Sequence, residues 1–544
     1  MSMTAFDNRI HPGRRWWRCC LLALLALSAA ARAESDFAAL VAALDAESYD
    51  DKAAAAAQLA ATAEPRVEQI LTHMLEGRLY TLKQTGEVVV ATPATQGYDV
   101  VAAASGADLG NVSKRKLRKI GVNNQLRGSL RDLLAHIRLA DADPAVRLAA
   151  VKNMAGQLDE PLAEVLREVR RGETDQRVLA AIDAALLLRD LDSDDADTRL
   201  RALAGLEGQV DNAVRNRLLT LSVDPAMDAA TRQAAARLLK AVDSQIAFYG
   251  GLETLFFGIS LGSILVLAAI GLAITFGVMG VINMAHGELI MLGAYTTFVV
   301  QQAMPQAIGW SLLVAVPAAF VVSGAVGIAI ERTVIRHLYG RPLETLLATF
   351  GVSLILQQAV RMIFSANNRA VLTPEWMSGS LVINDFLSLT YNRLYVVAFC
   401  LLVFGALLLI LRRTRLGLEV RAVSQNRAMA QAMGIRSGRV DAMTFGLGSG
   451  IAGIAGVALS QLTNVGPNLG QAYIVDSFMV VVFGGVGNLW GTLIGGMSLG
   501  IGNKLIEPWA GAVMAKILVL VFIILFIQKR PRGLFPQKGR AAEG

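Results

Sequence analysis

Apolar segments about as long as a bilayer is thick fill residues 250–530, and they limit the possible folds more than any other feature of this chain. They lie near 252–276, 283–303, 310–330, 344–363, 394–411, 442–460, 474–501 and 511–527. About 20 apolar residues in a helix cross the hydrocarbon core, where the backbone must satisfy its own hydrogen bonds. The sequence therefore predicts a polytopic bundle of membrane helices over residues 246–528.

Residues 34–245 are of another kind, because they are charged and rich in Ala, as in water-soluble domains. From about residue 141 they repeat a helix start on Asp or Thr followed by periodic apolar residues, as in DADPAVRLAAVKNM and DDADTRLRALAGL. This pattern predicts an α-solenoid similar to HEAT repeats. The stretches EVVVATP and YDVVAAA, within 78–103, predict a small β-hairpin among these helices. The expected fold class is otherwise all-α.

The first residues have the pattern of an export signal. Three arginines precede the apolar run CCLLALLALSAA, and the small-residue motif Ala31-Arg32-Ala33 follows it. We therefore predict that residues 1–33 are a cleaved signal peptide, with an uncleaved membrane anchor as the alternative. Both interpretations place residues 34–245 in the periplasm.

Arginine and lysine orient the membrane part. The link 412–439 and the tail 529–544 are rich in Arg, which predicts that both are cytoplasmic. A periplasmic N-terminal domain and a cytoplasmic tail require an odd number of crossings, whereas eight segments give an even number. The segment 474–501 is therefore expected to cross twice or to re-enter.

Glycines interrupt two of the apolar segments. Gly484, Gly485 and Gly487 break the segment 474–501, and Gly280 and Gly287 break the segment around 277–287. A pair of Gly-broken segments in two halves of a membrane domain is typical of an inverted repeat that surrounds a transport pathway.

Three polar residues lie in the apolar stretch VINMAHGELIMLGAY, namely Asn283, His286 and Glu288. Ionisable side chains at membrane depth rarely face lipid, and they usually line a transport pathway or take part in helix packing. Asn283 and His286 share one helical face and Glu288 points roughly opposite, so either the helix is unwound or one group bonds a neighbouring backbone. Further pathway candidates are Thr345, Thr349, Gln357, Asn464 and Asn488. Neutral groups suit a small uncharged solute, and interhelical hydrogen bonding is the alternative.

We find no catalytic, cofactor or metal motif in the sequence. The net charge of +7 comes with arginines beside membrane segments, which topology explains without nucleic acid. A G-x-x-x-x-G-K-[ST] phosphate loop is also absent from the sequence, so we expect ATP hydrolysis on separate subunits and no enzymatic activity in this chain.

Four stretches together carry a family resemblance. They are GLAITFGVMGVINMAHGELIMLGAY, LLATFGVSLIL, LGLEVRAVSQNRAMAQAMGI with the following GIAGIAGVAL, and VVVFGGVGNLWGTLIGG with the tail RPRGLFP. The chain resembles the permeases of branched-chain amino acid and urea ABC importers. Its long N-terminal domain, with LEGRLY and VNNQLR, is similar to that of the urea type. A branched-chain amino acid or another small amide is the alternative substrate, and a membrane sensor with an exported ligand-binding domain is a second alternative function.

This resemblance implies a permease subunit that moves urea across the bacterial inner membrane by alternating access, without a cofactor. It implies as partners a second related permease, two cytoplasmic ATPase subunits, a periplasmic substrate-binding protein and membrane lipid. Five residues match the coupling element that such permeases insert into the ATPase: Arg421, Asn426, Ala430, Gly434 and Ile435. A helix ended by Gly434 can pass a rigid-body push between subunits.

Overall fold

The structure, a computed structural model, describes residues 36–62, 64–94, 97–156, 158–384 and 386–536. The predicted signal peptide and residues 537–544 of the basic tail lie outside the described residues. Contacts divide the chain into two compact units, with the division between Val242 and Asp243.

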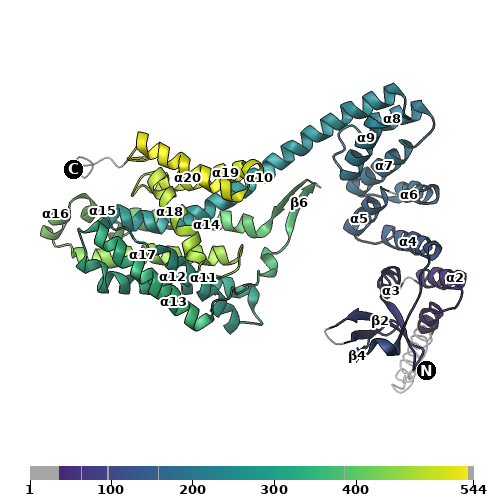
Figure 1. The fold of residues 1–544 in the computed structure, drawn as a ribbon, viewed down its shortest axis with the longest axis horizontal. Helices are drawn as coiled ribbons and strands as arrows, with labels where there is room; N and C mark the ends of the chain where they lie inside the picture. The colour runs from purple at the N-terminus through teal and green to yellow at the C-terminus, as the bar shows by residue number, and fades with distance from the viewer. Residues whose placement is uncertain (1–35, 63, 95–96, 157, 385, 537–544) are drawn as a thin grey trace, which may run out of the picture. The chain divides into compact units, whose positions relative to one another are not determined.

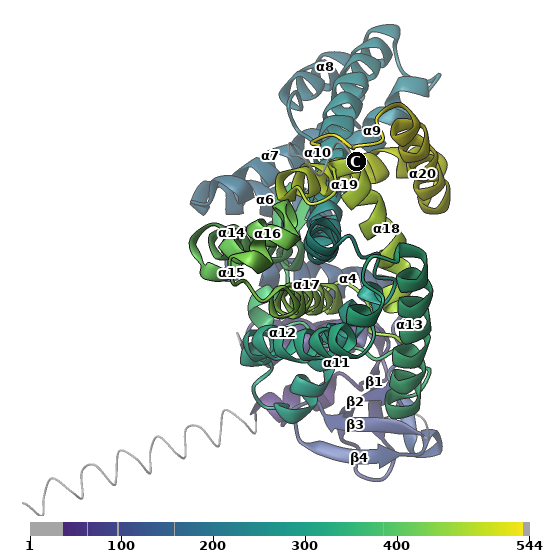
Figure 2. The ribbon, with the colours of Figure 1, turned by 90° about the vertical axis from the view of Figure 1, so that its left-hand side faces the viewer.

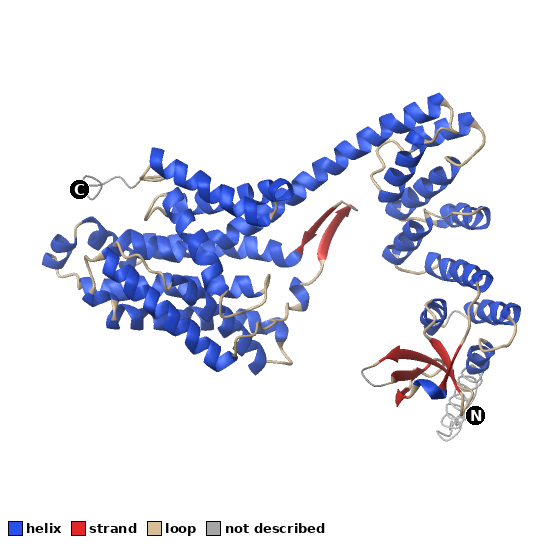
Figure 3. Ribbon diagram, in the orientation of Figure 1, coloured by secondary structure: helices blue, strands red, loops and turns tan. Residues whose placement is uncertain are grey.

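The first unit combines helices with one antiparallel sheet (Figure 3). Its helices are α2 (Tyr49–Ala60), α3 (Arg66–Leu75), α4 (Asn124–Leu139), α5 (Pro144–Met154), α6 (Glu160–Gly172), α7 (Gln176–Asp190), α8 (Ala196–Gly205) and α9 (Asn212–Val223), with the short η1 (Lys114–Lys116) before the last strand. Aspartates cap α5 to α9, because each carboxylate accepts a hydrogen bond from a free backbone N–H of the first turn.

The predicted hairpin is wrong in extent, since the structure has a five-stranded sheet in the order β4-β3-β2-β1-β5. The strands are β1 (Leu79–Leu82), β2 (Val88–Pro93), β3 (Tyr98–Ala102), β4 (Asp108–Val112) and β5 (Leu117–Lys119). The two edge strands β4 and β5 carry polar and charged residues and were not predicted, because edge strands need no alternation of buried side chains.

Helix α10 (Ala229–Met279) is 51 residues long and runs without a break through the predicted domain boundary at residue 245. Its sequence explains this continuity, because residues 229–249 consist mainly of helix formers and contain neither Gly nor Pro. The apolar C-terminal part of α10 begins the membrane unit.

The second unit is a helical bundle (Figure 1). Its helices are α11 (His286–Ala303), α12 (Ile308–Thr333), α13 (Pro342–Phe364), α14 (Tyr391–Arg413), α15 (Arg415–Gln425), α16 (Arg427–Ala432), α17 (Ser437–Ser460), α18 (Leu469–Gly484), α19 (Leu489–Ala510) and α20 (Ala512–Lys529). Short elements accompany them: η2 (Ile335–His337), η3 (Glu375–Met377), and the strands β6 (Ser380–Asn384) and β7 (Leu387–Thr390), which form a two-stranded ribbon.

Six of the described helices are long and apolar enough to cross a membrane, which fits a polytopic membrane protein. They are α10, α12 with η2, α13, α14, α17 and α20. The predicted segment 474–501 is split between α18 and α19 by a turn at the glycines.

Helix α17 is the centre of this bundle and packs against α11 and α12 (Figure 2). Glycines allow the close approach. A Cβ added to Gly293 of α11 would lie 2.0 Å from the Gly453 carbonyl of α17, and one added to Gly456 would lie 2.0 Å from the Ile290 carbonyl. These helices therefore touch backbone to backbone, and no larger residue fits at these positions.

Candidate functional site

The chain is unwound between α10 and α11, at residues 280–285. Gly280 adopts a φ of +66°, a conformation that ends α10 at little cost only for glycine. Asn283 is buried in the break, and its Oδ1 accepts a hydrogen bond from the Ala285 N–H at 3.0 Å. Its Nδ2 has no partner among the described residues, so one buried donor is left over.

His286 begins α11 and ties it to α10. Its Nε2 lies 2.8 Å from the Ala268 carbonyl, which can only accept, so Nε2 carries the hydrogen. The side chain is fully buried. Both alternatives raised by the sequence hold here, because the chain is unwound and His286 bonds a neighbouring backbone.

Glu288 points to helix α13, which also packs against α11. Its carboxylate Oε1 accepts a hydrogen bond from the Ser353 hydroxyl at 3.0 Å, and its Oε2 has no partner among the described residues. The residue is 1% exposed. A buried carboxylate with one unpartnered oxygen is costly and can accept a hydrogen bond from a solute.

A stripe of buried polar residues runs along α13, most of whose surface is otherwise exposed. Thr345, Thr349, Ser353 and Gln357 are spaced by four and share one face of the helix. The Thr349 hydroxyl accepts a hydrogen bond from the Met284 N–H at 3.1 Å, which places this face against the break before α11.

Not every member of the stripe faces a neighbour. The Thr345 hydroxyl bonds the Leu338 and Arg341 carbonyls at the start of its own helix, so its role here is to stabilise that helix end. The Gln357 Nε2 is buried without a partner among the described residues.

We call Asn283, Glu288, Thr349, Ser353 and Gln357 the α11–α13 seam. It holds three buried polar atoms with no partner among the described residues: the Asn283 and Gln357 amide nitrogens and the Glu288 Oε2. Buried polar groups are nearly always hydrogen-bonded, so unpaired atoms need an explanation. Two donors and one acceptor along one interface can bind a polar solute as it passes. No group of residues that could hold a metal is found among the described residues.

Sequence reasoning missed two residues at this seam. Ser353 holds Glu288, and Arg361 continues the stripe at the same spacing of four, with its Nη2 2.8 Å from the Asn468 Oδ1. Thr345, Thr349 and Gln357 fit a spacing of four residues with one position left out. Filling that position gives Ser353, and continuing four residues beyond Gln357 gives Arg361, so this spacing could have identified both residues.

The remaining predicted pathway residues have other surroundings. Asn464 is exposed in the loop between α17 and α18. Asn488 caps α19, because its Oδ1 accepts hydrogen bonds from the Trp490 and Gly491 N–H groups at 3.1 Å each. The structure therefore brings neither residue to the seam.

The predicted helix-break glycines lie at the end of a helix or in the turn beyond it, with the exception of Gly287. Gly287 lies inside α11 as a helical residue, where its role is contact, because an added Cβ would lie 2.5 Å from the Gly470 carbonyl of α18. Gly484 is the last residue of α18, and Gly485 and Gly487 take φ values of +105° and +77° in the following turn. The backbone of residues 534 and 535 hydrogen-bonds to this break.

The predicted coupling segment forms a compact helical pair, α15 and α16. Asn426 caps α16 by accepting a hydrogen bond from the Met429 N–H at 2.9 Å, and Gly434, with a φ of +87°, ends it. The Ile435 N–H donates to the Ala430 carbonyl at 3.0 Å, and both side chains join a small apolar cluster. Arg421 donates to the Leu411 carbonyl and holds α15 to the end of α14.

One more contact, which we call the clamp, fixes α16 to the bundle. Arg427, the first residue of α16, donates to Asp441 of α17, with Nη1 3.2 Å from Oδ1. Its guanidinium lies 3.9 Å from the centre of the Tyr339 ring. Asp441 is 3% exposed, so this is a partly buried ion pair. Sequence reasoning missed this pair, since the partners lie on different helices and follow no helical spacing.

The comparisons with known proteins concern mainly the membrane unit. The family model for the permease component of branched-chain amino acid transport systems matches residues 254–527. The high-affinity branched-chain amino acid transport system permease protein LivH of Escherichia coli K12 is 32% identical over 293 residues, which cover 52% of this chain and 94% of that protein. The corresponding protein BraD of Pseudomonas aeruginosa is 30% identical over 296 residues, covering 53% and 96%.

More distantly, the ribose import permease protein RbsC of Escherichia coli K12 is 32% identical over 110 residues, which cover 19% of this chain and 34% of that protein. No solved structure matches the chain. The helices, the broken segments and the match over residues 254–527 lead to one conclusion. The chain belongs to the family of branched-chain amino acid transport system permease components, and is a membrane permease subunit and not an enzyme.

Proposed function

We propose that this chain is the inner-membrane permease subunit of an ATP-driven importer and that its solute, a branched-chain amino acid, passes along the α11–α13 seam. The observation that carries the proposal is the set of unpartnered buried polar atoms of the seam, next to an unwound stretch of chain. Irregular backbone at membrane depth is tolerated where it lines a cavity or pathway.

The charges along the seam favour an amino acid over a neutral solute. Glu288 can carry a negative charge and Arg361 carries a positive one, with the unpaired Gln357 amide between them along the stripe of α13. A zwitterion can place its ammonium near the carboxylate and its carboxylate near the guanidinium, as charged groups in membranes are retained for such pairs. The named relatives transport branched-chain amino acids.

Urea is the second candidate, and the N-terminal unit is the observation that favours it. The relatives cover only about half of this chain, and the family model begins at residue 254, so the N-terminal unit is additional to the shared permease. Asn283, Thr349 and Gln357 are also neutral donors and acceptors that suit urea.

The complete importer of this proposal contains a second related permease, two cytoplasmic ATPase subunits and a periplasmic substrate-binding protein. The α15–α16 pair is the part that contacts the ATPase, through Arg421, Asn426, Ala430, Gly434 and Ile435. The N-terminal unit is periplasmic, forms a solenoid of helical repeats and takes part in docking the binding protein. The C-terminus is cytoplasmic.

The experiment is uptake of labelled leucine and of labelled urea by the complete importer in proteoliposomes. We expect leucine uptake that an excess of urea leaves unchanged. Glu288→Gln and Arg361→Gln are each expected to lower leucine uptake ~10- to 150-fold, the equivalent of one charged hydrogen bond of about 1.5–3 kcal/mol.

Thr345→Val is the matched control, because Thr345 is buried in the same stripe but bonds only its own helix end. We expect less than a threefold effect from it. If urea is taken up and leucine does not inhibit this uptake, the transported solute is urea and not an amino acid. Equal effects of all three substitutions would show that the seam acts on folding and not on transport.

A further inference from the structure

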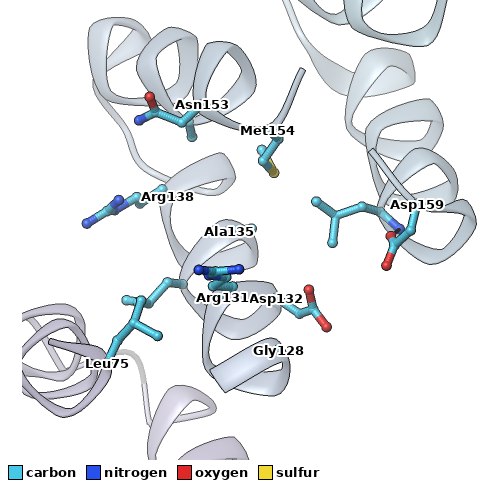
Figure 4. Close-up of a pocket in the computed structure, with 12 residues that line it drawn as sticks. Leu75, Gly128, Arg131, Asp132, Ala135, Arg138, Asn153, Met154 and Asp159 are labelled. Atoms are coloured by element: carbon cyan, nitrogen blue, oxygen red, sulfur yellow. Dashed lines mark hydrogen bonds between the residues drawn. The ribbon is translucent and has the colours of Figure 1, made fainter. Parts of the chain in front are cut away.

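A groove in the first unit has the features of a small-molecule site. It lies between α3, α4, α5 and α6 and has a volume of about 430 Å³ (Figure 4). Ligand pockets typically enclose ~300–1,000 Å³. Its apolar lining consists of Leu75, Leu134, Ala135, Ala150, Met154 and Leu162. The groove therefore has room and an apolar surface for one small ligand.

One face of α4 supplies the polar side of the groove. Gly128, Arg131, Asp132, Ala135 and Arg138 all line it, and their spacing places them on one side of the helix. Gly128 has no heavy atom within 4 Å of the place where a Cβ would lie, so that end of the groove is open.

The two arginines of this face differ in their partners. Arg138 donates from Nε to Glu68 of α3, at 2.7 Å, and is held by that ion pair. Arg131 makes no hydrogen bond or ion pair to any residue that the structure describes. A guanidinium has five donors in a planar fork that matches a carboxylate, so Arg131 is available to bind one.

Two carboxylates stand at the same groove. Asp159 caps α6 by accepting a hydrogen bond from the Leu162 N–H at 3.1 Å. The Asp132 carboxylate has no hydrogen-bond partner among the described residues, whereas the backbone carbonyl of Asp132 lies 2.8 Å from the His136 Nδ1. Burial, and then the nearby negative charge of Asp159, raise the pKa of Asp132 above its ordinary value. Two carboxylates that repel each other are stabilised when a cation lies close to both.

We propose that this groove binds an α-amino acid with an apolar side chain. The ammonium lies at Asp132 and Asp159, the carboxylate at Arg131, and the side chain on the apolar lining. Both charges and the apolar surface occur within one cavity, which a simple anion, a simple cation or a neutral amide would use only in part. The class of ligand follows from the groove, and its identity with the transported solute rests on the proposed function.

The first test measures binding of L-leucine to the purified full-length chain by titration calorimetry. Two analogues lack one charge each: isoamylamine has only the ammonium, and 4-methylpentanoate only the carboxylate. We expect each to bind at least tenfold more weakly than leucine. Arg131→Ala and Asp132→Asn are expected to remove the binding that the groove contributes, while Arg127→Ala, an exposed arginine of the same helix outside the groove, leaves it unchanged.

The second test locates the ligand, because the membrane unit also binds leucine under the proposed function. A photoreactive leucine carrying a diazirine is cross-linked to the full-length chain and the labelled peptides are identified by mass spectrometry. We expect label within residues 128–162 that excess leucine displaces and that Arg131→Ala abolishes.

The outcomes separate this inference from the proposed function. Displaceable label in the groove with no leucine transport supports the groove and overturns the proposed substrate. If leucine is transported but no displaceable label is found at residues 128–162, the groove is not a leucine site, while leucine remains the transported solute. If Arg131→Ala and Asp132→Asn both bind leucine as the wild type does, the proposed site in the groove is wrong.

Discussion

The clamp between α16 and the bundle gives the sharpest prediction about coupling to the ATPase. Asp441→Asn keeps the shape of the side chain and removes its charge, leaving Arg427 without a carboxylate partner. Breaking a buried ion pair costs about 3–5 kcal/mol. The Arg427 side chain is 27% exposed and recovers some hydration, so we expect about 2–3 kcal/mol. Because 1.36 kcal/mol is a factor of ten, the docked position of α16 should become ~30- to 150-fold less favourable.

Under the proposed function, the assay is the number of leucine molecules imported for each ATP hydrolysed by the complete importer in proteoliposomes. We expect this ratio to fall at least fivefold in Asp441→Asn, while ATP hydrolysis continues, since the ATPase sites lie on other subunits. Arg427→Lys is expected to give an intermediate ratio, because lysine keeps the charge but loses the planar fork and the stacking on Tyr339.

Glu344→Gln is the matched control. The pair of Arg341 and Glu344 has a similar separation of 3.1 Å, but the two side chains are 66% and 55% exposed. Exposed pairs contribute about 0–1 kcal/mol, so the ratio should change less than threefold. An unchanged ratio in Asp441→Asn, in protein that melts at the wild-type temperature, would refute the reasoning. Equal losses in both variants would do so as well.

Three further predictions concern stability of the purified chain, measured by thermal unfolding. Gly293→Ala should lower the unfolding temperature by several degrees because its Cβ meets a backbone carbonyl at 2.0 Å, whereas Gly351→Ala, with open space around it, should not. Gly485→Ala should also destabilise, since a φ of +105° strains any other residue. Glu173→Gln should cost roughly 1–3 kcal/mol at neutral pH. Hydrogen bonds from Arg147 lower the pKa of Glu173 from 4.5 to about 2, so this contribution is complete above pH 4.5 and is lost as the pH falls through 2; equal acid sensitivity of variant and wild type would contradict it.

Much of the fold could be predicted from local sequence. The length of the apolar segments predicted the membrane helices. The aspartates before α5 to α9 predicted helix starts, because a capping hydrogen bond joins residues only two or three positions apart. The edge strands β4 and β5 could not be predicted, because Asp108 and Asn111 of β4 and Lys119 of β5 are of types that are depleted in strands, and they pair only because β3 and β1 offer them an edge.

The site was predictable in part for the same reason. Asn283, Glu288, Thr349 and Gln357 all stood out as polar residues in apolar segments. Partners from distant segments did not stand out. Arg427 and Asp441 look like ordinary charges of an Arg-rich link between apolar segments until the fold brings α16 against α17.

The backbone contacts of α17 also determine how motion travels through the membrane unit. Side chains at an ordinary helix interface absorb small displacements by changing rotamer, but glycines at 293, 453 and 456 have no rotamers to change. A shift of α11 must therefore move α17 as a rigid rod or break the contact. The clamp lies at the first turns of α17, so such a rod connects the unwound stretch before α11 mechanically with the α15–α16 pair.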